Sequence, residues 1–288
     1  MSKSINILIT GANGQLGMEF RSLQNKFPEI IFTFAGRDQL SIENKDQIKE
    51  YFRSQPYDYC INCAAYTAVD KAEEEIELAE NINGRAVGDL ASVCFENNVK
   101  LFHISTDYVF DGNANTPYKE QDRISPVNEY GRSKLLGEAL AINHNPESIV
   151  IRTSWVYSEF GKNFVKTMLR LMKEKESINV VSDQKGSPTY AADLAEAIIS
   201  IIKKQKFVPG VYHYCNEGVI SWFDFAEAIG DLSGLECVVN PIPTTAYPTP
   251  AKRPAYSALE TSKIKATFSI SIPKWKDSLQ ECLKKVLQ

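Results

Sequence analysis

The sequence has no long apolar run and no surplus of basic residues. Over 288 residues, 36 acidic side chains outnumber 32 basic ones, and the formal net charge is -4. A nucleic-acid-binding surface usually carries a basic stripe, so no nucleic-acid partner is expected. The apolar run INILI, residues 5–9, is too short for a secretion signal or a membrane span. We therefore expect a cytoplasmic protein without a membrane partner.

Histidine is scarce, and the six cysteines lack a metal-binding pattern. His103, His144 and His213 are far apart in the sequence, so we expect structural roles for them and no metal site. Cys60 and Cys63 form a C-x-x-C pair, but no second pair follows at zinc-like spacing. Because the pair lies within a predicted strand, buried thiols in a reducing compartment are the favoured interpretation.

The first half of the chain alternates short β-branched or aromatic runs with longer stretches of helical periodicity. Buried strands are predicted at residues 5–9, 30–35, 57–62, 100–105 and 148–153, and helices at 14–26, 44–54, 72–97 and 130–144. This order predicts an α/β fold with a doubly wound parallel sheet of the Rossmann type.

After residue 155 the alternation loosens. Helical patterns occur at 161–175, 191–204, 221–232 and 274–287, and strand-like runs at 178–182, 211–214 and 237–242. Residues 240–257 hold five of the 13 prolines, which excludes a helix or a central strand there. We predict a dinucleotide-binding domain over residues 1–155, which also receives elements from 178–215. A smaller α+β domain, mainly substrate-binding, is predicted over residues 156–288.

A glycine-rich turn follows the first predicted strand. In ILITGANGQLG, Gly11, Gly14 and Gly17 form G-x-x-G-x-x-G between a strand and a helix. The first glycine permits a tight turn, the second lets a pyrophosphate approach the backbone, and the third lets the helix pack against the sheet. The free N–H groups and the positive dipole at the helix start favour phosphate. The sequence therefore predicts a dinucleotide cofactor at this turn.

The second predicted strand ends in AGRDQL, where folds of this class contact the adenosine ribose. An acidic residue there binds the 2′-hydroxyl of NAD, whereas an arginine suits the 2′-phosphate of NADP. Both types are present, as Arg37 and Asp38. Because Arg37 comes first, we expect NADPH and leave NADH open. A surface arginine without a ligand is the alternative.

Tyr130 and Lys134 lie four positions apart at the start of a predicted helix, about 6 Å apart along its axis and on one face. An ammonium group stabilises a phenolate, so we expect Lys134 to lower the pKa of Tyr130 from its ordinary value of about 10. Such a tyrosine can donate a proton to a developing alkoxide. Thr106 ends the fourth predicted strand, at the edge where α/β sheets bind ligands. Taken alone, the Tyr–Lys spacing also suits an exposed ring and a solvated lysine.

These features occur together in the short-chain dehydrogenase/reductase superfamily, and the chain resembles its extended branch. Narrower motifs follow one another from residue 11 to 257: GANGQLG, NCAAYTAVDKAE, ISTDYVFDG, YGRSKLLGE, RTSWVY, GKNFVKTML, DQKGSPTYAADLA and AYPTPAKRPAYS. On these motifs the chain resembles the dTDP-4-dehydrorhamnose reductase family.

The resemblance implies an oxidoreductase that acts on a small nucleotide sugar. It would reduce the C4 ketone of dTDP-4-dehydro-L-rhamnose with NADPH or NADH, and its product would enter bacterial polysaccharides. Tyr130 would donate the proton, and Lys134 would lower the pKa of Tyr130 and hold the nicotinamide ribose. Thr106 would bind the ketone oxygen.

The resemblance also implies the binding residues. The other cofactor-binding residues are Gly11, Asn13, Gly14, Gln15, Leu16, Arg37, Ser41, Ile42, Ala64, Ala65, Tyr66 and Ile104. The substrate-binding residues are Thr67, Thr106, Asp107, Tyr108, Trp155 and Arg253. Arg253 is assigned to the diphosphate because a guanidinium pairs with two phosphate oxygens at once. Packing at the domain junction is the alternative for Trp155, and a surface position is the alternative for Arg253.

Two positions depart from the family pattern. Many relatives carry an aspartate where this chain has Ser41, and some form magnesium-bridged dimers through glutamates, whereas Gln15 follows the second glycine here. We therefore expect a monomer or homodimer without a metal. Two other functions share these motifs: an NAD-recycling nucleotide-sugar epimerase or dehydratase, and a non-catalytic, NADP-binding regulatory subunit of the methionine adenosyltransferase type.

Overall fold

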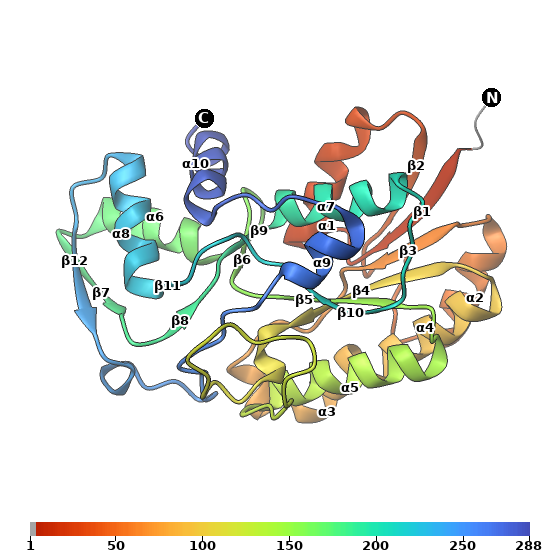
Figure 1. The fold of residues 1–288 in the computed structure, drawn as a ribbon, viewed down its shortest axis with the longest axis horizontal. Coiled ribbons are helices and arrows are strands. Elements are labelled where there is room, and N and C mark those ends of the chain that lie inside the picture. Colours follow the sequence, from red (N-terminus) through yellow and green to blue (C-terminus); the bar gives the residue numbers. More distant parts are fainter. Residues whose placement is uncertain (1–3) are drawn as a thin grey trace.

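The structure, a computed structural model, describes residues 4–288. A six-stranded parallel sheet with the order β10-β5-β4-β3-β1-β2 forms its larger part (Figure 1). The strands are β1 (Ile5–Thr10), β2 (Ile30–Ala35), β3 (Tyr59–Asn62), β4 (Lys100–Thr106), β5 (Ile149–Thr153) and β10 (Gly210–His213). The predicted doubly wound parallel sheet is confirmed.

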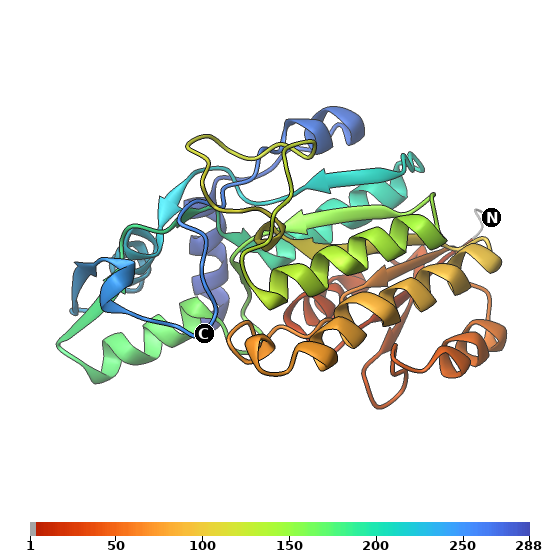
Figure 2. The same cartoon turned by 90° about the horizontal axis from the view of Figure 1, so that it is seen from below.

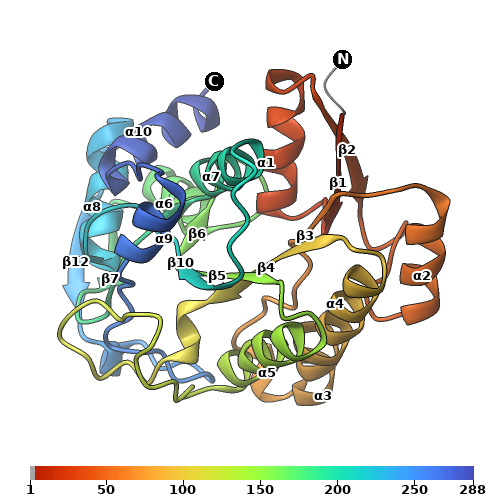
Figure 3. The same ribbon diagram turned by 45° about the vertical axis from the view of Figure 1, so that its right-hand side comes forward.

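Helices cover both faces of this sheet (Figure 3). The alternating side chains of β1 show the division: Ile7 and Ile9 pack with α1 (Gln15–Leu23) and α7 (Ala191–Lys203), whereas Leu8 packs with the opposite layer. That layer holds α2 (Lys45–Ser54), α4 (Ala86–Glu96) and α5 (Glu129–His144), which lie side by side in Figure 2. All three β1 side chains are fully buried, which stabilises the fold by about 1.5–3 kcal/mol for each of them.

The strand order creates a ligand crevice. After β1 the chain passes to β2 on one side, and it then returns to β3 on the other side of β1. Helices therefore diverge on opposite faces from the carboxyl ends of β1 and β3, and open α/β sheets bind ligands at such a switch point. Thr10, Asn62 and Thr106 all end strands at this edge.

The smaller part of the molecule has its own apolar core. It comprises α6 (Phe164–Glu174), α8 (Trp222–Ser233), α10 (Trp275–Val286) and a parallel pair, β7 (Ser177–Val181) with β12 (Val238–Ile242). In the sequence between β7 and α8, the chain returns to the large sheet and adds α7 and β10 to it. The division into domains at residue 155 stays a prediction.

Several short elements were not predicted. They are β6 (Val156–Tyr157), β8 (Lys185–Gly186), β9 (Thr189–Tyr190), β11 (Ile220–Ser221) and α9 (Ser262–Phe268). Two-residue strands carry no periodic signal, because one alternation cannot be distinguished from chance.

The single helix predicted over residues 72–97 is wrong. The chain instead forms a 3₁₀ turn at Lys71–Glu73, α3 (Ile76–Glu80), a π-helical turn at Asn81–Arg85 and then α4. The buried Asn83 explains the irregular turn, because its amide bonds both the N–H and the C=O of Tyr66 and also Ser133 Oγ, at 2.8–3.0 Å. Such π-helical turns are frequent at functional sites. Within residues 4–288, no helix is both long and apolar enough to cross a membrane.

Candidate active site

A cavity of about 760 Å³ runs from the glycine-rich turn to the start of α5. Most of the predicted site residues line it: Gly11, Asn13, Gly14, Gln15, Leu16, Arg37, Ser41, Ile42, Ala64, Ala65, Thr67, Ile104, Thr106, Asp107, Tyr108, Tyr130, Lys134 and Trp155. They come from the carboxyl ends of β1 to β4, from α5 and from the segment after β5. The fold therefore brings residues that are more than a hundred positions apart to one cavity.

The glycine-rich turn has the shape of a phosphate cradle. Gly11 has φ +62°, and a Cβ there would lie 2.5 Å from the backbone of Ala64. Gly17 lies so close to the turn that a Cβ would lie 2.6 Å from Ala12 Cα. Gly14 precedes α1, and no side chain caps the first N–H groups of that helix. These groups are left for an anion, so the residues present fit a dinucleotide.

The adenosine side of the cavity carries charges of both signs. Arg37 and Asp38 both line the cavity with Ser41. The Arg37 side chain is mostly exposed and pairs with Glu43 at 3.0 Å, and Asn81 Nδ2 donates to the other oxygen of Glu43. Glu43 therefore holds the guanidinium at the rim, where a 2′-phosphate can reach it.

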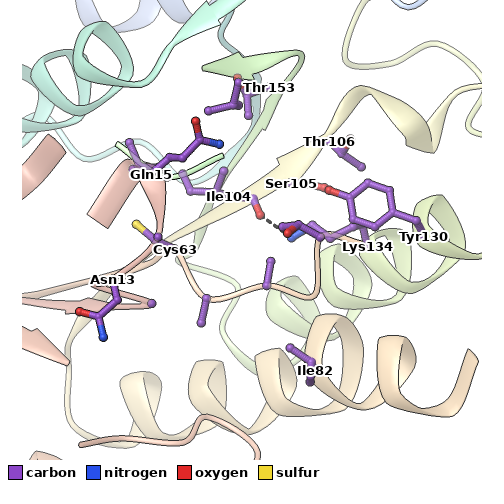
Figure 4. Close-up of a pocket in the computed structure, with 18 of the residues that line it drawn as sticks. Asn13, Gln15, Cys63, Ile82, Ile104, Ser105, Thr106, Tyr130, Lys134 and Thr153 are labelled. Atoms are coloured by element: carbon purple, nitrogen blue, oxygen red, sulfur yellow. Dashed lines mark hydrogen bonds between the residues drawn. The ribbon is translucent and has the colours of Figure 1, made fainter. Parts of the chain in front are cut away.

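The helix α5 holds Tyr130 and Lys134 against the end of β4. Asn128 caps this helix by accepting the N–H of Gly131 at 2.7 Å, so Tyr130 lies in the first turn. One turn later, Lys134 Nζ donates to the carbonyl oxygen of Ile104 at 2.6 Å (Figure 4). Both side chains reach the cavity, as their spacing predicts.

The pKa of Tyr130 shifts in the direction opposite to our expectation. Burial raises it, the charge of Asp107 raises it further, and a hydrogen bond with Thr106 acts the other way. Burial also lowers the pKa of Lys134 to about 8, although the charge of Glu138 opposes that shift. The Lys134 ammonium is directed to Ile104, and desolvation outweighs any attraction it exerts on the phenol.

Thr106 and Asp107 form a buried pair at the end of β4. Thr106 Oγ1 donates to Asp107 Oδ1 at 3.0 Å and accepts the N–H of Tyr108 at 3.2 Å. Asp107 Oδ2 is buried and makes no well-formed hydrogen bond. The nearby Ser257 hydroxyl acts to lower the pKa of this carboxyl, but burial outweighs it and raises the pKa to about 7. Tyr108 packs edge-on against Tyr130 with ring centroids 5.7 Å apart. An unpaired buried acceptor on the cavity wall fits a ligand hydroxyl.

Trp155 lies at the junction with the smaller part of the molecule. Its ring stacks on Trp222, with centroids 3.5 Å apart, and both residues line the cavity. Its backbone has φ +48°, which costs of order 1–3 kcal/mol for a residue other than glycine. Both the packing role and the ligand role considered for Trp155 are compatible with this position.

Two predicted residues lie outside the cavity lining. Tyr66 turns its hydroxyl to Glu75 at 2.7 Å, and its backbone is bound by Asn83. Arg253 pairs with Asp70 at 2.7 Å and also contacts the Tyr108 hydroxyl, whose pKa it lowers against a larger rise from burial. Motif position placed both residues near the site, but their side-chain partners decide where they point.

No ligand-binding role was predicted from the sequence for several residues of the cavity wall. Cys63, Ile82, Thr153 and Lys162 line it (Figure 4 labels the first three), as does Trp222. Lys162 belongs to the motif GKNFVKTML, and its neighbour Asn163 donates to Gln15 Oε1 at 2.9 Å. That motif was the available signal, because a lysine beside a glycine in a loop suits a phosphate ligand. Among residues 4–288, no cluster of three or more His, Cys, Asp or Glu side chains could hold a metal ion.

Comparison with known proteins places this site in a family. The sequence profile of the RmlD substrate binding domain matches residues 5–288. The chain belongs to this family. The dTDP-4-dehydrorhamnose reductase of Aggregatibacter actinomycetemcomitans is 42% identical over 287 residues, which cover 95% of this chain and 97% of that protein. The predicted resemblance to dTDP-4-dehydrorhamnose reductases is therefore confirmed.

Two crystal structures of relatives share the whole fold. A dTDP-4-dehydrorhamnose reductase from Clostridium acetobutylicum superposes with a TM-score of 0.94 at 39% identity, covering 99% of this chain and 100% of that chain. The enzyme of that name from Bacillus anthracis, solved in complex with NADP, has a TM-score of 0.94 at 37% identity and covers 98% and 99% of the two chains.

Proposed function

We propose that this protein reduces the C4 ketone of dTDP-4-dehydro-L-rhamnose to dTDP-L-rhamnose with NADPH. The observation that carries the proposal is one cavity that holds both a phosphate cradle and a Tyr–Lys–Thr set. A relative with 42% identity over nearly the full chain bears the name of this activity, and another was solved with NADP.

The cofactor supplies a hydride to the sugar C4, and the protein supplies the proton and the geometry. We propose that Tyr130 donates the phenolic proton to the oxygen that becomes an alkoxide. Its raised pKa keeps the phenol protonated through neutral pH. The hydroxyl of Thr106 turns its proton from Asp107 Oδ1 to the same oxygen, and Lys134 binds the nicotinamide ribose beside Ile104. These groups stabilise charge that develops in the transition state, where stabilisation raises the rate.

The remaining predicted residues divide between the two ligands. We propose that Gly14, Gln15 and Leu16 bind the pyrophosphate through the start of α1. The unpaired Asp107 oxygen accepts a sugar hydroxyl, and Trp155 packs against the sugar. Tyr66 contributes its backbone, since its side chain is bound to Glu75. A monomeric or homodimeric state stays a prediction.

The experiment that tests this function follows the loss of reduced-nicotinamide absorbance with dTDP-4-dehydro-L-rhamnose. We expect stoichiometric consumption of NADPH and formation of the 4-hydroxy sugar. Conversion of a nucleotide sugar without net consumption of NADPH would indicate the epimerase or dehydratase alternative. Tight NADP binding without any turnover would indicate the regulatory subunit.

Arg37 is expected to set the preference for NADPH. We predict that Arg37→Gln raises the Kd for NADPH about tenfold and leaves that for NADH unchanged, because a lost charge-assisted hydrogen bond of about 1.4 kcal/mol corresponds to that factor. Fluorescence titration with each cofactor measures the effect. Arg53→Gln, on the exposed last turn of α2, is the control. Equal effects on both cofactors would contradict a role for Arg37 at the 2′-phosphate.

Arg253 is proposed to bind the substrate diphosphate after exchanging its partner Asp70. We predict that Arg253→Gln raises the KM for the nucleotide sugar by about tenfold or more, with an unchanged Kd for NADPH, because a charge-assisted bond is lost. Steady-state kinetics with both substrates varied separates the two constants. A fall in kcat at unchanged KM would instead indicate that Arg253 only supports Tyr108, which it contacts.

A further inference from the structure

Behind the cavity, one carboxylate joins the elements that carry the proposed catalytic groups. Glu138 lies one turn after Lys134 on α5 and is almost fully buried. Ser105, the neighbour of Thr106 on β4, donates its hydroxyl to Glu138 Oε1 at 2.5 Å. Arg152 on β5 donates Nε to the same oxygen at 2.9 Å and Nη2 to Oε2 at 2.7 Å. Glu138 therefore bonds to β4 and β5 from the helix that carries Tyr130 and Lys134.

Arg152 is enclosed on every side. It is 1% exposed, its Nη1 donates to the carbonyl oxygen of Glu120 at 3.4 Å, and it lies at 3.4 Å from His213 Nε2. Its guanidinium also lies over the ring of Phe110. A buried ion pair of this kind contributes little net stability compared with apolar residues of the same volume. Stability alone therefore does not account for its place directly behind the proposed catalytic groups.

The surroundings of Lys134 give the carboxylate a second role. The titratable groups that face Lys134 are Cys63 after β3, His103 on β4, and Glu138 on α5. Burial raises the pKa of the Cys63 thiol and lowers the pKa of His103, so both are neutral near pH 7. Among these three groups, Glu138 alone brings a negative charge to the buried ammonium.

We propose that Glu138 is a positioning residue for the reduction: it fixes Thr106 on β4 against Tyr130 and Lys134 on α5, and it keeps Lys134 charged. This inference rests on the function proposed above. Glu138 lies outside the cavity lining and would contact neither substrate nor cofactor. The residue acts through Ser105 and through the charge of Lys134.

The test begins with Glu138→Gln, which keeps the side-chain volume and removes the charge. We expect kcat to fall between about tenfold and a hundredfold, because the reacting groups lose their alignment. The loss of activity at high pH should also move to lower pH by roughly one unit, since a missing opposite charge lowers the pKa of the ammonium. The Kd for NADPH, measured by fluorescence titration, should stay close to the wild-type value.

A double variant separates this role from simple pairing with Arg152. Glu138→Gln leaves a buried guanidinium without a counterion and lowers the melting temperature. Adding Arg152→Met removes that charge, so the melting temperature should recover. The high-pH limb of the pH–rate profile, where activity is lost, should stay displaced to lower pH, and kcat should stay low. Recovery of both kcat and the pH profile in the double variant would overturn the proposal, because Glu138 would then serve only as the counterion.

Glu19→Gln provides a matched control. Glu19 is also a buried helical carboxylate that accepts a serine hydroxyl, from Ser158 at 2.6 Å, but it lies on α1. We expect its high-pH limb to coincide with that of the wild type, and an equal displacement would overturn the proposal. A wild-type protein without reductase activity would overturn the proposed function itself, whereas an active wild type with an unaltered Glu138→Gln variant would overturn this inference alone.

Discussion

The Tyr130→Phe variant is expected to lose turnover by a factor of about 10²–10⁴, the usual contribution of a positioned general acid. The substitution removes one oxygen atom and leaves the ring packed against Tyr108. Hydride transfer would then produce an alkoxide that the Thr106 hydroxyl still binds but that lacks the proton from Tyr130. Single-turnover measurement of NADPH oxidation with saturating nucleotide sugar reports this step directly.

The same variant should bind NADPH as the wild type does. Lys134 is held by the Ile104 carbonyl and not by the phenol, so the ribose contact does not depend on the Tyr130 hydroxyl. Unchanged turnover in Tyr130→Phe would show that the proton comes from elsewhere. Asp107 would then be the next group to test, because burial raises the pKa of its carboxyl to about 7 and part of it is protonated near neutral pH.

Gly11→Ala is expected to abolish useful NADPH affinity and to destabilise the fold severely. The backbone at Gly11 has φ +62°, and the added methyl group would lie 2.5–2.6 Å from backbone atoms of Cys63 and Ala64. Those atoms cannot move without displacing the loop after β3, which lines the cavity. The left-handed backbone alone costs an alanine about 1–2 kcal/mol, and the collision adds to that.

Gly234→Ala separates these two costs. Gly234 ends α8 with φ +64°, nearly the value of Gly11, but no atom lies within 4 Å of the added methyl group. We expect this control to lose about 1–2 kcal/mol of unfolding free energy in urea and to bind NADPH normally. A Gly11→Ala protein no less stable than the control, and with wild-type NADPH affinity, would mean that the cradle is not as tight as described.

The phosphate cradle and the Tyr–Lys pair could be predicted from the sequence because both are local features. Gly11, Gly14 and Gly17 occur within seven residues, and their function depends on backbone shape between one strand and one helix. Tyr130 and Lys134 share a helix face whatever surrounds it. Predictions of this kind need only the correct element at the correct place, and the elements were long enough to be recognised.

Other features depend on tertiary partners that no local pattern reveals. Glu138 and Arg152 look like ordinary charged residues in the sequence, and only the packing of α5 against the sheet buries both. The π-helical turn follows from Asn83 bonding to a loop 17 residues earlier in the chain. The pKa of Tyr130 was expected to fall because the sequence shows the cation four residues away, whereas the larger influence, burial, appears only in the fold.

The path of the polypeptide between its two lobes limits how this protein can be recombined. The chain leaves the large sheet after β5, forms α6 and β7 of the smaller lobe, and comes back with α7 and β10. It then departs again to complete the smaller lobe with α8, β12 and α10. In a chimera joined at residue 155, α7, which packs beneath β1, and the edge strand β10 would come from a different parent than the rest of the large sheet. Leu194 and Ile198 would then have to match foreign neighbours. Neither lobe is formed by one continuous stretch of chain. Exchange of sugar specificity between relatives therefore requires grafting individual loops and not a whole lobe.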